Sequence, residues 1–71
     1  MKRWNYRVVL KNGTYAIYEC FYDIEGSFVS ISETKTIPIG ESFIELQKDF
    51  ELMTESFRKP ILKYEDFRKN N

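Results

Sequence analysis

The chain has 71 residues, with 11 basic and 11 acidic side chains, one cysteine and no histidine. A single small domain, residues 1–71, fits this length, and a core of this size is marginal unless it is dense or continues into a partner. The zero net charge disfavours a dedicated nucleic-acid binder. The lone cysteine disfavours a secreted disulfide scaffold and favours a cytoplasmic protein. No apolar run approaches the roughly 18–20 residues of a membrane span.

The first predicted element is a β-hairpin around Asn12-Gly13. This dipeptide favours the two-residue turn that joins antiparallel strands, and alternating apolar residues flank it on both sides. We expect strands over residues 4–11 and 14–23, and the turn fixes their register. The expected pairs are Leu10 with Tyr15, Val8 with Ile17, Tyr6 with Glu19, and Trp4 with Phe21.

A third strand is predicted over residues 27–34. Gly26 suits the left-handed position of a three-residue loop, which pairs Asp23 with Ser27. In that register Val29 and Ile31 join the apolar face of the hairpin, whereas a four-residue loop would turn them to the opposite face. The result is a three-stranded antiparallel meander.

A helix is predicted over residues 42–59. Ser42 can cap it while Glu45 completes a capping box, and Pro60 ends it. Apolar residues recur inside it at spacings of three and four, which forms one stripe along the helix. This stripe consists of Phe43, Leu46, Phe50, Met53 and Phe57.

These elements predict an α+β fold in two layers, with the single C-terminal helix packed on one face of the meander. The stripe would cover the face that carries Trp4, Tyr6 and Val8. Residues 60–67 would form an extended tail over the sheet edge or the helix end. One helix cannot cover both faces, so the second face is expected to stay open.

The chain resembles a family of small, uncharacterised bacterial proteins. The matching motifs are Trp-Asn-Tyr-Arg-Val at residues 4–8, an aromatic run before an acidic glycine turn at 18–26, Gly-Glu-Ser-x-x-Glu-Leu at 40–46, and Lys-Pro-x-Leu at 59–62. This resemblance implies a bacterial origin and no particular activity. More distantly, the order of three strands followed by a capped helix is similar to the HicB-type antitoxin domain, which implies a regulator linked to nucleic acid.

The sequence offers no catalytic, cofactor-binding or metal-binding constellation. It has no histidine, no cysteine pair and no glycine-rich phosphate loop. Glu19 falls on the apolar face between Tyr6 and Ile31, where we interpret it as structural rather than as a catalytic acid. Cys20 has no base to activate it, so we interpret it as a passive thiol. We therefore expect no enzyme and no small-molecule substrate.

The second face of the sheet is the candidate interface, because an uncovered aromatic cluster on a small domain typically marks a contact with another protein. Its residues are Arg7, Val9, Tyr18, Cys20, Tyr22 and Phe28. The favoured hypothesis is a non-enzymatic module that forms a homodimer or docks an unidentified protein partner through this face. Two alternatives stay open, a merely amphipathic face in contact with solvent and a stacking platform for single-stranded RNA, with Arg7 and Lys11 holding phosphates.

Overall fold

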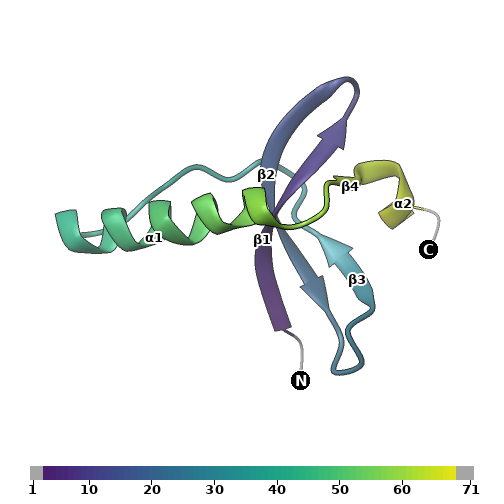
Figure 1. Ribbon diagram of the computed structural model, residues 1–71, viewed down its shortest axis with the longest axis horizontal. Coiled ribbons are helices and arrows are strands. Elements are labelled where there is room, and N and C mark those ends of the chain that lie inside the picture. The colour runs from purple at the N-terminus through teal and green to yellow at the C-terminus, as the bar shows by residue number, and fades with distance from the viewer. Residues whose placement is uncertain (1–2, 69–71) are drawn as a thin grey trace.

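The computed structural model describes residues 3–68 and has an α+β fold (Figure 1). Its sheet is mixed, in the order β3-β2-β1-β4. The elements in chain order are β1 (Arg3–Lys11), β2 (Thr14–Tyr22), β3 (Phe28–Ile31), α1 (Phe43–Glu55), the 3₁₀ turn η1 (Ser56–Arg58), β4 (Leu62–Lys63) and α2 (Tyr64–Arg68). Helix α1 lies on one side of the sheet, and α2 lies on the opposite side, directly after the edge strand β4 (Figure 1).

The predicted β-hairpin is confirmed with its register. Asn12 and Gly13 have φ angles of 52° and 79°, which gives the left-handed backbone that a two-residue turn between twisted strands requires. Leu10 lies opposite Tyr15, and each predicted pair along β1 and β2 is present as far as Trp4 opposite Phe21. The alternation of side chains along the hairpin therefore follows directly from the Asn-Gly turn.

The third strand departs from its predicted register. The turn closes as expected, with Gly26 at a φ of 91° and the Asp23 N–H donating to the Ser27 carbonyl. Tyr22 then pairs with Phe28, but Phe21 pairs with Ser30, so the strand contains a bulge at Val29. This extra residue reverses the facing of the rest of the strand, and Ile31 lies opposite Cys20 instead of Glu19. The prediction that Ile31 shares the face of Val8 is wrong.

The predicted extended tail is correct only in part, because Leu62–Lys63 form the short edge strand β4 but Tyr64–Arg68 form the helix α2. Leu62 pairs in parallel with Val9 on β1, which adds a fourth strand at the edge of the sheet. Tyr64 and Phe67 then pack against the second face of the sheet. The C-terminal segment thus supplies the second covering layer that the predicted single helix could not provide.

Helix α1 begins where the sequence predicts. The Ser42 hydroxyl accepts a hydrogen bond from the Glu45 N–H at 3.1 Å and so caps the first turn. The Glu45 carboxylate accepts one from the Glu41 N–H, one residue before the cap. Gly40 is required nearby, since a Cβ at this position would clash with the backbone of Leu46. The α-helix ends at Glu55, and η1 continues the winding to Arg58.

The predicted packing of α1 across the sheet is wrong. Only the C-terminal end of the helix lies against the sheet, and its other end projects away from it beside the connector that follows β3 (Figure 1). Met53 is buried, whereas Phe43, Phe50 and Phe57 are exposed. The reason lies in the flank of the helix: Asp49, which is outside the stripe, accepts hydrogen bonds from the Tyr6 hydroxyl and the Ile39 N–H. These bonds hold α1 by its polar side and leave the stripe uncovered.

The bulge can be tested with a pair of matched valine substitutions. Val9 is 0% exposed and Val29 is 44% exposed, so Val9→Ala should lower the free energy of unfolding by about 2–3 kcal/mol and Val29→Ala by less than ~1 kcal/mol. Urea unfolding followed by circular dichroism measures both. Equal losses would contradict the observed register.

Candidate functional site

The predicted interface on the second sheet face is the core of the domain. Val9 and Cys20 are fully buried, Tyr18 is nearly so, and partly buried residues from β3, β4 and α2 surround them. The Tyr18 ring lies 5.8 Å from that of Tyr64, between ring centroids. The expectation that this face is open is wrong, because the C-terminal segment covers it.

The remaining predicted interface residues lie around this core. Arg7 is buried, its Nη2 donates a 2.7 Å hydrogen bond to the Pro60 carbonyl, and its guanidinium lies 5.2 Å from the centre of the Phe28 ring. Phe28 also packs edge to face against Tyr22 and Phe67. Arg7 therefore joins β1 to the segment that precedes β4, and its cationic face contacts an aromatic ring.

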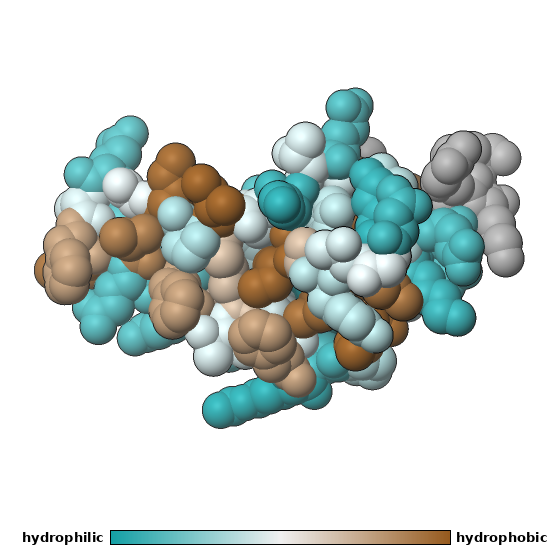
Figure 2. Space-filling model, turned by 90° about the horizontal axis from the view of Figure 1, so that it is seen from above, coloured by the Kyte–Doolittle hydropathy of each residue, from teal (hydrophilic) through white to brown (hydrophobic). Residues whose placement is uncertain are grey.

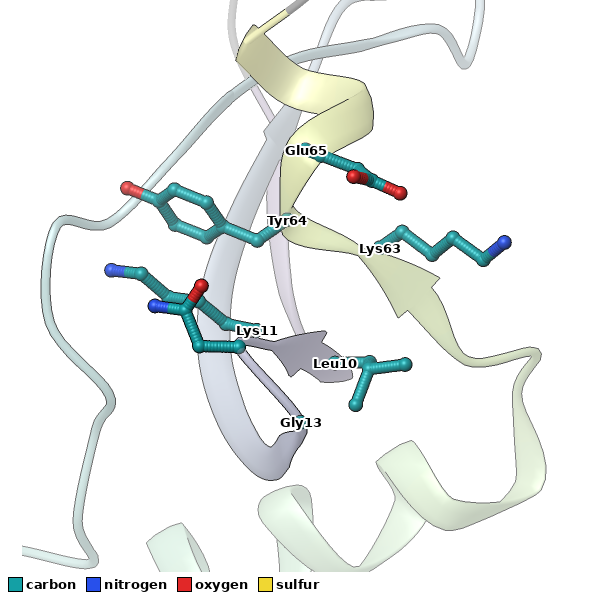
Figure 3. Close-up of a pocket in the computed structure, with 7 residues that line it drawn as sticks. Leu10, Lys11, Gly13, Lys63, Tyr64 and Glu65 are labelled. Carbon is teal, nitrogen blue, oxygen red and sulfur yellow. The ribbon is translucent and has the colours of Figure 1, made fainter.

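Lys11 is engaged in a similar way near the hairpin turn. Its ammonium lies 4.1 Å from the centre of the Tyr64 ring, and Figure 3 shows the two side chains extending in the same direction from β1 and α2. The RNA-platform interpretation requires Tyr18, Tyr22 and Phe28 for stacking, with Arg7 and Lys11 for the phosphates. In the structure, each of them contacts residues of the chain itself.

Cys20 lies in an environment that suppresses nucleophilic chemistry. Burial raises the pKa of its thiol to about 11, against an opposing influence of the Arg7 charge. The Sγ atom lies 4.0 Å from the Tyr18 carbonyl, to which it donates. A thiol that stays protonated near neutral pH is a poor nucleophile, so the interpretation of Cys20 as passive agrees with its surroundings.

Tyr6 makes the polar contact between the sheet and α1. Its hydroxyl donates to the Asp49 carboxylate at 2.5 Å, the length of a charge-assisted bond. Burial, this hydrogen bond, and the negative charges of Asp49 and Glu19 raise the pKa of the Tyr6 hydroxyl. Glu19 is half-buried directly opposite Tyr6, so the two carboxylates flank one phenol that stays protonated.

An uncovered apolar groove runs along α1, and we call it the α1 groove. It starts at the projecting end of the helix and continues between the helix and the connector onto the sheet. Figure 2 shows hydrophobic residues gathered over the projecting end and the middle of the molecule. The groove is lined by Val8, Tyr15, Ile17, Thr36, Pro38, Phe43, Leu46, Phe50, Met53 and Phe57.

The two apolar surfaces that border this groove are visible in the sequence, but their patterns predict that both surfaces are buried. The stripe of α1 is visible in the spacing of its apolar residues, and the first sheet face is visible in the hairpin alternation. Two such surfaces in one small domain are expected to bury each other. Because hydrogen bonds from Tyr6 and Ile39 direct the Asp49 side of α1 toward the sheet, the stripe and the first sheet face do not pack together. They border one open groove instead.

A second hollow lies between the hairpin turn and the C-terminal segment (Figure 3). Asn12, Lys11, Lys63 and Glu65 give it a polar lining. Within residues 3–68 no cluster of three histidine, cysteine or carboxylate side chains is placed to hold a metal ion. No helix of this part of the chain is long and apolar enough to cross a membrane.

Comparison with known proteins found no matching family model, no similar curated protein and no similar solved structure. Function must therefore be inferred from the geometry of this chain. The two main features are a closed aromatic core on one sheet face and the open α1 groove on the other.

The raised pKa of Cys20 predicts an alkaline loss of stability. Above the ordinary thiol pKa the unfolded chain loses a proton that the folded chain keeps up to pH ~11, so the free energy of unfolding falls as pH rises over that interval, by at most ~1.4 kcal/mol per unit. Urea titrations at about pH 8 and about pH 10.5 measure this loss. Cys20→Ala should show a shallower decline than the wild type, and parallel declines would contradict the assignment.

Removing the Tyr6 hydroxyl should loosen α1 from the sheet. Tyr6→Phe deletes a hydrogen bond to a charged group and should lower the free energy of unfolding by about 1–2 kcal/mol. Tyr15→Phe is the matched control, because the Tyr15 side chain is exposed. Thermal unfolding compares the two variants, and a control loss as large as that of Tyr6→Phe would argue against the Tyr6–Asp49 contact.

Proposed function

We propose that this protein is a non-enzymatic interaction module that binds another protein chain through the α1 groove. The observation that carries the proposal is the exposure of the helix stripe, in which Phe43, Phe50 and Phe57 are each more than half exposed. Aromatic side chains are enriched at the centres of protein interfaces. Our expectation for its setting is a bacterial cytoplasm.

The exposed stripe has a substantial energetic cost if nothing covers it. Each apolar square ångström removed from water contributes about 25 cal/mol, and a small domain has little stability to spare. Monomeric soluble proteins seldom expose contiguous apolar patches beyond a few hundred Å². A binding partner for the α1 groove gives these side chains a stabilising role.

Other features of the molecule support a binding role over a catalytic one. The single thiol is buried and held protonated, and the cations that could hold phosphate groups contact rings of the chain itself. The α1 groove is apolar along most of its lining, with Thr36, Gln47 and Thr54 as its polar side chains besides the Tyr15 hydroxyl. Such a surface suits the apolar face of another protein segment.

Site-specific photocrosslinking in cells tests the proposal. A photoreactive phenylalanine analogue at Phe43 should give covalent protein adducts, because this side chain lies at the open end of the groove. The same analogue at Lys48, which lies on the opposite side of α1, should give none. Absence of adducts at Phe43, or equal adducts at both positions, would contradict an interaction site in the groove.

A further inference from the structure

We infer that the occupant of the α1 groove is a second copy of this chain, which packs its own α1 antiparallel along the stripe about a two-fold axis. This inference rests on the proposed function and names the partner. Four features of the described residues support it: the spacing of the stripe, the charges along its border, the direction in which α1 projects, and the apolar area left exposed.

The stripe has the spacing of a helix that pairs with another helix. Its residues follow one another at intervals of three, four, three and four, which is the heptad pattern of two-helix seams. Met53 is buried within its own chain, so the side chains available to a partner are Phe43, Leu46, Phe50 and Phe57. In a two-fold contact each residue i meets j while j meets i. An antiparallel pair therefore places Phe50 near the axis and brings Phe43 of each copy toward Phe57 of the other.

The border of the stripe permits two acidic helices to approach each other. Gln47 and Thr54, both uncharged, flank the stripe on its open side and line the groove. Lys48, Glu51 and Glu55 lie farther around the helix. Like charges facing one another across a seam would destabilise it, and this arrangement keeps them away from it.

The projection of α1 favours the antiparallel direction. The sheet lies at the C-terminal end of the helix, and the other end extends beyond it (Figure 1). In an antiparallel pair the projecting half of one helix, with Phe43, lies over the hollow that Tyr15 and Ile17 line in the other copy. A parallel pair would leave both hollows empty.

The exposed aromatic area of the groove is a large part of what one partner of a specific dimer buries. Phe43, Phe50, Phe57 and Tyr15 are 78%, 58%, 69% and 61% exposed. Together they equal between two and three complete aromatic side chains, or roughly 500 Å². The aliphatic lining of the same groove brings this toward the ~800 Å² per partner of a standard interface.

Sedimentation velocity of the purified chain, from micromolar to millimolar concentration, tests the inference with two charge-matched variants. Phe50→Glu places a carboxylate on the seam and should raise the dimer dissociation constant at least about thirtyfold. Ile44→Glu adds the same charge at an exposed apolar position of α1 outside the stripe and should change it less than about threefold. Phe43→Glu, at the outer end of the helix, repeats the seam test where folding is least at risk.

Disulfide formation tests the direction of packing. Mixed chains carrying Phe43→Cys and Tyr15→Cys should crosslink to each other, while Phe43→Cys alone should not, and the buried Cys20 contributes no background. Crosslinking of Phe43→Cys chains to themselves would overturn the antiparallel arrangement. Equal weakening by Phe50→Glu and Ile44→Glu would overturn the seam.

The experiments distinguish a failure of the proposed binding role of the groove from a failure of the inference about its occupant. A wild type that is monomeric at every concentration overturns the second copy as the occupant. If the Phe43 photoprobe still yields an adduct with a different protein, the interaction module stands with another partner. If it yields none, the interaction module falls as well.

Discussion

Both faces of the β1–β2 hairpin are apolar, and the rest of this short chain covers one of them fully and the other only in part. The C-terminal segment covers the face of Val9, Tyr18 and Cys20. Helix α1 cannot serve as an equal cover for the other face, because the Asp49 bonds to Tyr6 and Ile39 fix it by its flank. The positions of the C-terminal segment and of α1 therefore determine which face becomes the core and which face keeps an open groove.

Local chemistry made half of this fold predictable. Asn12-Gly13 with alternating neighbours determines the hairpin register, and the Ser42–Glu45 box determines where α1 begins. These features depend on residues close together in the sequence, whose geometry the turn or the cap imposes directly. The loop at Gly26 was predictable for the same reason.

The rest depends on competition between surfaces distant in sequence. The bulge at Val29 places Phe28 and Ile31 together on the second face, and no local signal separates this arrangement from the unbulged one. The short β4 owes its strand conformation to pairing with β1, which sequence periodicity over two residues cannot indicate. Both apolar faces and the aromatic cluster are recognisable in the sequence, but the face predicted to be open is the one that the C-terminal segment covers.

The parallel pairing of β4 with β1 has a consequence for biosynthesis. Val9 pairs with Leu62, so β1 is synthesised well before the strand that pairs with its outer edge. Until residues 62–67 leave the ribosome, the aromatic cluster around Tyr18 and Cys20 has no lid and is accessible to chaperones or to nascent neighbours. Pairing β4 with β1 closes a long loop, and the entropy lost in that closure opposes the contacts that complete the core.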